Sequence, residues 1–469
     1  MNATPREHTT PELSPSYVSK NSFLDPKFLR IEAERLWPRV WQVACRLEEI
    51  PSVGRFITYD VANESLIVVR TGPDTIKAFH NTCRHRGMRL LEGTGQCKQI
   101  ICPFHGWRWN LEGDNTLVVD RTDWGTTLSD QDLRLREALV DTWGGFVFIN
   151  MDLNAEPLQK FLSPINERCK NYEFEKLRFR WYRTVVLPCN WKLAVEAFDE
   201  SYHVQQTHRQ VLNWIEDYSN SGAFGRHSAF WYPTEVDGQY QMTGSKRLNR
   251  DPLPDAREYI LDFVEHFHHE LAAMITPRAY EATQRLRTEV APDALPSEVL
   301  MKWAQFQQEA AVADGAGWPP ITLEDIKNSY VDWHMFPNTV FLHSSVDGVL
   351  WYRARPNGDD PGSCIFDIWS LVRYAPGAEP TLVRERYENW RDCKWGQILT
   401  QDFVNLERMQ KGLKSMSFQH LRPNPVQEVP IANFHRALEE FVAAPQTEGK
   451  TTAERKSNSS PASSVDATK

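Results

Sequence analysis

The stretch "CRHRGMRLLEGTGQCKQIICPFHG", residues 83–106, contains two cysteine–histidine pairs. Cys83 and His85 are separated by one residue, Cys102 and His105 by two, and sixteen residues lie between the two pairs. Four soft or borderline ligands on two loops can hold either a zinc ion or an iron–sulfur cluster. Aromatic and glycine residues around the second pair would provide a low-dielectric pocket and free backbone N–H donors. The stretch therefore predicts a metal site made by two loops.

The composition and charge of the chain limit its function to a few classes. A length of 469 residues allows two or three domains, and 41% hydrophobic with 25% charged residues is typical of a globular protein. A net charge of −9 without a polybasic block argues against nucleic acid or a membrane surface as partner. The sequence has neither an apolar run that could span a membrane nor the apolar core of a signal peptide. Eight cysteines are sparse for this length, and the six outside the pairs show no paired spacing, so we expect a reducing, cytoplasmic location.

The pattern of apolar and turn residues divides the chain into two domains. Residues 38–155 contain short alternating runs such as "GRFITYDV" and "GGFVFINM" separated by turn residues, which predict a small all-β domain. In residues 156–445, strand patterns surround a helical insertion at 254–330 and precede a final helix, which predicts an α+β domain built on an antiparallel sheet. We expect residues 1–37 to form a polar arm followed by an amphipathic helix, and residues 446–469 to form a disordered tail.

The mixed composition of the two Cys–His pairs favours a [2Fe–2S] cluster over zinc. One iron can take both thiolates and the other both imidazoles, and the predicted β-domain is larger than most zinc modules. "CRHRG" followed by "CPFHGW" resembles the Rieske cluster motif, which is C-x-H, about sixteen residues, and C-x-x-H. The resemblance implies that Cys83 and Cys102 bind one iron and that His85 and His105 bind the other. A structural zinc site at the same four residues is the alternative.

A second pair of histidines lies in "NWKLAVEAFDESYHVQQTHRQ", residues 190–210. His203 and His208 are five residues apart, which separates them by about 140° on an ideal helix. One metal ion could contact both only if the helix widens or ends between them. Two histidines and a carboxylate form the facial triad of non-haem Fe(II) oxygenases. "NWK", Glu196, an acid three residues before His203 and the H-x4-H spacing together resemble the iron motif of Rieske non-haem iron oxygenase large subunits, the aromatic-ring-hydroxylating dioxygenase family.

This resemblance implies a third iron ligand on a C-terminal helix. "TQDFVNLERMQKGL", residues 400–413, matches the family pattern Q-D-x4-E-x2-Q-x-G and nominates Asp402, with Glu407 as a competing carboxylate. The resemblance also implies the fold, a Rieske domain followed by a catalytic domain whose antiparallel sheet is flanked by helices in a helix-grip-like arrangement. In this fold we expect the substrate pocket to be lined by Phe341, His343 and Trp351.

Family members carry an acid near the first iron histidine that links the iron site to a cluster histidine of the neighbouring subunit. Here Asp199 and Glu200 precede His203 at i−4 and i−3, and helix geometry does not choose between them. The spacing from His203 favours Glu200, as in carnitine-oxygenase-like members. The resemblance therefore implies a route from His105 through Glu200 to His203 of the next subunit, and with it a head-to-tail ring.

The resemblance implies a terminal oxygenase that uses O2 and a mononuclear Fe(II) to hydroxylate or dihydroxylate an aromatic or other apolar ring, as in aromatic hydrocarbon catabolism. The alternatives are a monooxygenase that performs O- or N-demethylation, and a zinc-binding or electron-carrier module without oxygenase activity. The chain contains no G-x-G-x-x-G after a strand and no plant-type C-x4-C-x2-C, so electrons from NAD(P)H must arrive through a separate reductase, with or without a ferredoxin. We expect a homotrimer, or an α3β3 assembly with a small beta subunit.

Overall fold

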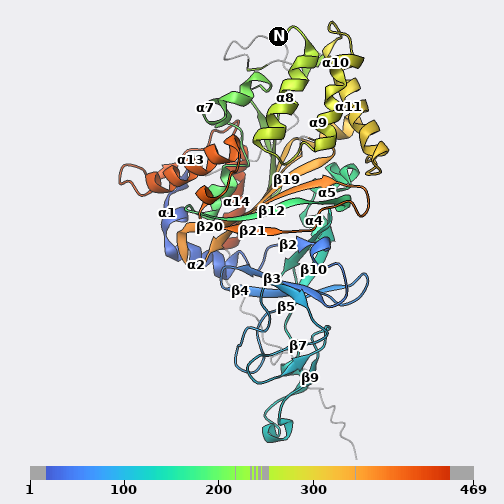
Figure 1. Ribbon diagram of the computed structural model, residues 1–469. Coiled ribbons are helices and arrows are strands. Elements are labelled where there is room, and N and C mark those ends of the chain that lie inside the picture. Colours follow the sequence, from blue (N-terminus) through green and yellow to red (C-terminus); the bar gives the residue numbers. More distant parts are fainter. Residues whose placement is uncertain are drawn as a thin grey trace, which may run out of the picture.

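The computed structural model describes residues 17–216, 218–232, 235–236, 239–240, 244–245, 253–343 and 345–443. The predicted tail at 446–469 lies outside these residues. The predicted N-terminal helix is present as α2 (Pro26–Arg35), which begins where the Asp25 side chain accepts a hydrogen bond from the backbone N–H of Lys27. Figure 1 shows the two main parts of the molecule, a lower part built of strands and an upper part in which a sheet carries helices.

The N-terminal domain is built on an antiparallel sheet of seven strands in the order β2-β11-β10-β5-β4-β3-β6. These strands are β2 (Gln42–Arg46), β3 (Arg55–Val61), β4 (Glu64–Arg70), β5 (Ile76–His80), β6 (Thr94–Gln96), β10 (Glu137–Trp143) and β11 (Phe146–Asn150). A smaller sheet lies at the lower end of Figure 1 and consists of β7 (Ile100–Ile101), β8 (Arg108–Trp109) and β9 (Asn115–Leu117). The prediction of a β-domain at the N-terminal end is confirmed.

The C-terminal domain is built on an eight-stranded sheet in the order β13-β14-β17-β18-β19-β20-β12-β21. These strands are β12 (Leu177–Leu187), β13 (Asn220–Phe224), β14 (His227–Trp231), β17 (Asp332–Met335), β18 (Thr339–Leu342), β19 (Gly348–Asn357), β20 (Asp360–Arg373) and β21 (Arg384–Tyr387). Neighbouring strands are antiparallel, except that β12 and β21 are parallel. The predicted α+β domain with an antiparallel sheet is therefore confirmed.

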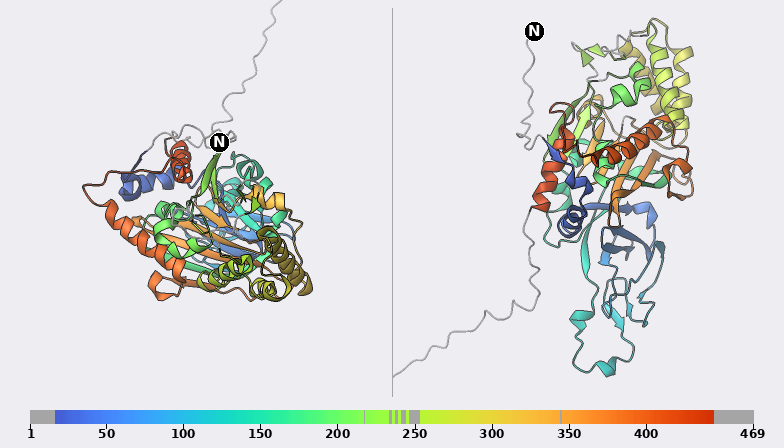
Figure 2. Two further views of the ribbon diagram at one scale, coloured as in Figure 1. Left: turned by 90° about the horizontal axis from the view of Figure 1, so that it is seen from above. Right: turned by 90° about the vertical axis from the view of Figure 1, so that its left-hand side faces the viewer.

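Helices pack beside and above this sheet (Figures 1 and 2). The helical insertion forms a cluster of four helices with its own apolar core. These helices are α8 (Ala256–Glu270), α9 (Pro277–Gln284), α10 (Leu286–Glu289) and α11 (Pro296–Ala313). The long helix α13 (Gln397–Leu413) buries Leu399, Asp402, Phe403 and Leu406, which share one face because they recur at helical spacing. Asp402 is thus held on the buried face of α13.

Buried ion pairs and hydrogen bonds join the two domains into one core. Arg353 on β19 pairs with Asp367 on β20 at 2.6 Å and also donates to two backbone carbonyls of β2. Arg46 on β2 donates in turn to the carbonyl of the first residue of β12. One face of the eight-stranded sheet is therefore covered by the N-terminal domain, which leaves the opposite face for a pocket.

The fold contains no disulfide bond among its cysteines, all of which lie in the described residues. All eight cysteines are free thiols, and six of them are buried. Packing and hydrogen bonds therefore hold the fold together without disulfide bonds. Among the helices of the described ranges, none is long and apolar enough to cross a bilayer.

Candidate active site

Two matching turns hold the residues of the Cys–His pairs. In the first turn, the backbone N–H of Cys83 donates to the carbonyl five residues further on at 2.8 Å, and Gly87 N–H donates back to Cys83. Cys102 and Gly106 repeat this pattern, again with a first bond of 2.8 Å. Gly87 and Gly106 have φ angles of 77° and 71°, a left-handed conformation that glycine adopts without strain. The turns therefore explain why glycine follows each histidine.

The turns bring the two cysteines together inside the domain and the two histidines together at its surface. Cys83 and Cys102 are 3% and 2% exposed, and their thiols lie next to each other. The Nδ1 atoms of His85 and His105 are 3.2 Å apart at the surface, and the Trp107 ring stacks on His85. Two sulfurs on the buried side and two ring nitrogens on the exposed side fit a cluster with one iron held by sulfur and the other by nitrogen.

The "NWK" sequence anchors the segment that carries the second pair of histidines. Helix α6 (Trp191–Glu196) begins after Asn190, whose side chain accepts a hydrogen bond from the backbone N–H of Lys192. The buried Lys192 ammonium pairs with Glu32 of α2 at 2.5 Å, and the Trp191 indole N–H donates to the same carboxylate. Because a buried charge is stable only when it is paired, this contact ties α6 firmly to the N-terminal helix.

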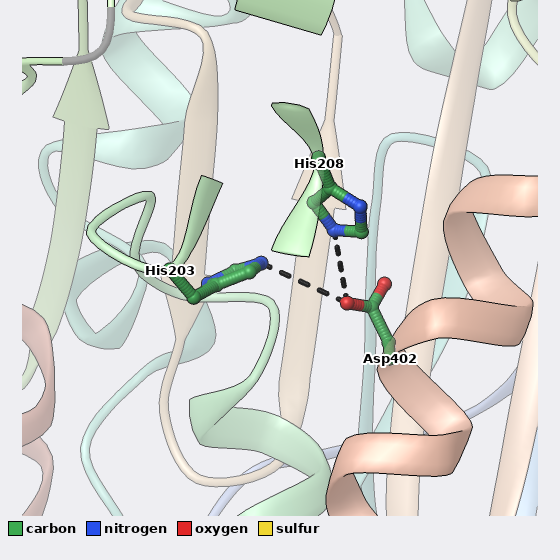
Figure 3. Close-up of side chains that lie close together, drawn as sticks. All are labelled: His203, His208 and Asp402. Carbon is green, nitrogen blue, oxygen red and sulfur yellow. Dashed lines mark ion pairs between the residues drawn. The ribbon is translucent and has the colours of Figure 1, made fainter. Parts of the chain in front are cut away.

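The three residues of the predicted iron site converge on one point (Figure 3). His203 and His208 flank the single-turn helix α7 (Val204–Thr207), and the chain leaves helical geometry at His208, so the ring centroids are 5.1 Å apart. Asp402 Oδ1 lies 2.9 Å from Nε2 of His208 and 3.7 Å from Nε2 of His203. One ligand atom from each residue lies within 4.8 Å of the others. Two imidazoles and one carboxylate on one side of a point are the donor set of a facial triad.

Hydrogen bonds determine which nitrogen of each histidine faces Asp402. Nδ1 of His208 lies 2.8 Å from the side-chain oxygen of Gln401, and Nδ1 of His203 lies 2.6 Å from Oε1 of Glu200. Amide and carboxylate oxygens only accept hydrogen bonds, so each Nδ1 carries a proton and each Nε2 is the ring nitrogen that faces Asp402. This is the form in which histidine binds a metal. The sequence motif contains Gln401, but its spacing does not predict the contact with His208.

The structure separates the two acids that precede His203. Glu200 accepts from the His203 ring and, through its second oxygen, from the backbone N–H of His203 at 3.2 Å. The buried Asp199 carboxylate has no hydrogen-bond partner among the described residues, and the imidazole of His334 is 3.6 Å away. Glu407 points away from the site and pairs with two cationic side chains. Of these acids, Glu200 is the one in contact with His203.

A cavity of about 350 Å³ adjoins His203, His208 and Asp402. Strands of the eight-stranded sheet and helix α8 of the insertion both contribute to its lining. The lining is rich in aromatic side chains, which include Phe198, Phe230, Tyr259, Phe263, Phe267 and Tyr352. A mostly apolar cavity of this size next to a metal site is suited to bind a small organic molecule.

Phe341, His343 and Trp351 do not line this cavity, so this part of the prediction is wrong. Phe341 and Trp351 are paired across β18 and β19 on the face that packs against the N-terminal domain, and the Trp351 ring lies 4.3 Å from a ring of β11. Side chains alternate between the two faces of a strand, so the neighbours Leu342 and Tyr352 face the cavity instead. The prediction identified the strands correctly and missed the face.

The fold and the two ligand groups define a protein with an N-terminal Rieske-type domain and a separate mononuclear metal site. The family model described as "Rieske [2Fe-2S] domain" matches residues 40–122, and the one described as "Ring hydroxylating alpha subunit (catalytic domain)" matches residues 174–444. The second match covers more than half of the chain. The chain belongs to the ring-hydroxylating alpha subunit family, whose cofactors are a Rieske [2Fe–2S] cluster and a mononuclear iron.

Two curated relatives match 49% and 38% of the chain. The glycine betaine monooxygenase oxygenase subunit of Chromohalobacter salexigens is 28% identical over 241 residues, which are 49% of this chain and 54% of the relative. The carnitine monooxygenase oxygenase subunit of Acinetobacter pittii is 31% identical over 182 residues, 38% of this chain and 48% of the relative. The chain spans about half the length of the curated relatives it matches.

Solved structures match nearly the whole chain at low identity. A quaternary ammonium Rieske monooxygenase in complex with L-carnitine has a TM-score of 0.60 at 17% identity, and the match covers 94% of this chain and 99% of the other. Naphthalene 1,2-dioxygenase with bound indole has a TM-score of 0.59 at 19% identity, covering 91% and 92%. At such identities these structures establish the fold alone.

Proposed function

We propose that the chain is the terminal oxygenase component of a multicomponent enzyme, which uses O2 and external electrons to oxidise an organic molecule bound in the cavity. The observation that carries this proposal is the position of the three ligand atoms, within 4.8 Å of one another at the wall of the 350 Å³ cavity. A structural zinc site would be closed by four protein ligands and would need no cavity. His203, His208 and Asp402 would hold the iron, which supplies open positions for O2 when it is bound.

The chain's own residues prepare this site for a divalent metal and a substrate. Glu200 and Gln401 hold a proton on Nδ1 of His203 and His208, so that Nε2 is the nitrogen of each ring that would bind the metal. The Asp402 carboxylate, 4% exposed, supplies the negative charge that a divalent cation requires at a buried position. The aromatic lining keeps bulk water away from the bound substrate.

The reaction we favour is monooxygenation of a substrate that carries a quaternary ammonium group. Support comes from relatives named as glycine betaine, carnitine and choline monooxygenases. Hydroxylation of an N-methyl carbon would consume one O2, two electrons and two protons, and would form one water. The N-hydroxymethyl product would break its C–N bond, releasing formaldehyde, a proton and the demethylated amine. Ring hydroxylation is the second candidate, supported by the aromatic side chains that line the cavity.

Electrons would reach the iron site between subunits. In one chain, β7–β9 and the cluster turns lie at the lower end of the molecule, whereas α7 and the iron site lie in its upper part (Figure 1). A second cavity, of about 270 Å³ and bounded by α13, reaches Glu200, His203 and Asp402. This cavity offers a place where a cluster histidine of another subunit could approach Glu200. We propose a route from His105 of one subunit through Glu200 to His203 of the next, within a homotrimer that receives electrons from a reductase, with or without a ferredoxin.

A panel of substrates tests the reaction. The purified chain, a surrogate reductase and NADH are given choline, glycine betaine, carnitine or naphthalene, and O2 uptake and products are measured together. We expect one ammonium substrate to give formaldehyde or aldehyde in step with O2 uptake, and Asp402→Ala to abolish it. A cis-diol from naphthalene would select the second candidate. Iron-replete protein that couples O2 uptake to no product across an extended panel would refute the oxygenase proposal.

A pair of variants tests the route through Glu200. Glu200→Gln keeps the shape of the side chain but removes its charge, so it should retain both metals and slow reoxidation of the reduced cluster in stopped-flow mixing with O2 and substrate. Asp199→Asn, the matched control at the adjacent position, should change this rate much less because Asp199 does not contact His203. The reverse ranking would move the bridge to Asp199. A monomer with full activity would refute the route between subunits.

A further inference from the structure

A row of side chains across the sheet points into the cavity beside the iron site. Phe230 on β14 is paired with Asp332 on β17, and Asp332 is paired with Leu342 on β18. Directly paired residues of antiparallel strands lie on the same face of a sheet. All three residues line the cavity. The Asp332 carboxylate therefore belongs to the floor of the substrate cavity, flanked by two apolar side chains.

Asp332 is a deeply buried acid in the wall of the cavity. The residue is 2% exposed, and its Oδ1 atom has no hydrogen-bond partner among the described residues. Burial raises the pKa of its carboxyl group well above the usual range. Most buried carboxylates in proteins are paired or hydrogen-bonded, because an isolated charge is costly to remove from water. An acid with such an unpaired oxygen in the floor of a binding cavity indicates that its partner is supplied by the bound molecule.

The remaining lining favours a cation as that partner. Rings of Phe230, Trp214, Tyr259, Phe263 and Tyr352 contribute to the cavity. The face of an aromatic ring attracts a positive charge, and the attraction grows when water is excluded. Aromatic rings together with one carboxylate suit a substituted ammonium ion, whose charge is spread over apolar methyl groups.

We propose that Asp332 is the carboxylate that recognises the positive charge of an organic cation bound in the cavity. This inference rests on the proposed function, which places a substrate with a quaternary ammonium group in this cavity. It assigns to Asp332 the selection of substrates by their charge. A bound cation stabilises the ionised carboxylate, and the carboxylate in turn holds the cation close to the sheet. Asp332 would thus act on substrate selection and leave iron binding to His203, His208 and Asp402.

Two probes of the same shape and different charge test the proposal. Choline and 3,3-dimethyl-1-butanol differ in that a neutral carbon replaces the ammonium nitrogen. Isothermal titration calorimetry of the holoenzyme, without reductase or turnover, should give choline an affinity at least about tenfold higher than the alcohol. Asp332→Asn should remove most of this preference while the iron content and the melting temperature stay near those of the unchanged protein. Glu216→Gln, which removes a less buried acid of the same lining, should retain it because solvent screens that charge.

Several outcomes would overturn the proposal. Equal affinity of the unchanged protein for the two probes, or binding of neither probe, would refute the proposal. This part of the test does not depend on the folding of a variant. A preference that survives Asp332→Asn, or that is lost in Glu216→Gln instead, assigns the recognition to another residue. Cation binding without oxidation would count against the proposed function and leave this inference standing. Oxidation of neutral rings without cation binding would refute this inference and support the proposed oxygenase function.

Discussion

Gln401→Leu should weaken iron binding at His203, His208 and Asp402 without disturbing the Rieske cluster. The Gln401 side chain accepts the hydrogen bond from Nδ1 of His208 at 2.8 Å, and His208 is only 5% exposed. Leucine has a similar size but cannot accept this bond, so the Nδ1–H group would be left buried and unsatisfied. Such a group costs roughly 1–3 kcal/mol. Because about 1.4 kcal/mol corresponds to a factor of ten, iron affinity should fall about 10–100-fold, the usual effect of removing such a supporting contact.

The assay is a competition for Fe(II) under anaerobic conditions. Protein depleted of mononuclear iron is titrated with Fe(II) against a chromophoric chelator, while the visible spectrum of the cluster is recorded in parallel. Gln401→Glu keeps an acceptor oxygen and should retain most of the affinity. Gln210→Leu is the matched control, because Gln210 donates to the same Gln401 oxygen at 2.9 Å without touching His208. Unchanged affinity in Gln401→Leu, or an equal loss in Gln210→Leu, would refute the reasoning.

Three further predictions concern the cluster, the iron ligand and the domain interface. The purified chain should be brown and contain acid-labile sulfide, and Cys83→Ser should lose both; a colourless protein with zinc would contradict this. Asp402→Ala should lose the mononuclear iron and keep the visible spectrum of the cluster, and iron analysis that finds the metal retained would exclude Asp402 as a ligand. Asp367→Asn leaves the buried Arg353 guanidinium unpaired and should lower the free energy of unfolding by about 3–5 kcal/mol in chemical denaturation. Burial alone would raise the pKa of Asp367, but Arg353 and Arg355 hold it at about 2. Since the unfolded value is about 3.9, the stability from this pair is present above about pH 4 and is lost as the pH falls toward 2, a dependence that Asp367→Asn should lack.

The sequence allowed the four cluster residues to be predicted because their positions are set by local turns. Cys83 and His85 lie on one turn, Cys102 and His105 lie on the other, and Gly87 and its counterpart fix the backbone of each turn. Residue types and spacing within such a short segment nearly determine how the side chains converge. The β-domain could also be predicted from local sequence, because its strands are short runs of alternating apolar residues.

The iron site was less accessible to sequence reasoning. His203 and His208 could share a metal only if the helix widened or ended between them, and the single turn of α7 decides between these alternatives. Asp402 lies on a different helix, and its nomination depended on resemblance to a family. The choice of Glu200 over Asp199 depended on side-chain direction, which two adjacent positions in a sequence do not reveal.

The substrate cavity could not be predicted because both faces of the central strands are buried. Every residue of β17 is buried, and β18 and the first part of β19 are buried almost throughout, so no polar–apolar alternation marks which side chains face the cavity. Phe341 and Leu342 are equally plausible from the sequence, and a shift of one residue exchanges the faces. An acid within such a strand is a signal that remains. A charged residue with apolar layers on both sides needs either a protein partner or a ligand, and Asp332, whose Oδ1 has no hydrogen-bond partner among the described residues, faces the space where a ligand would lie.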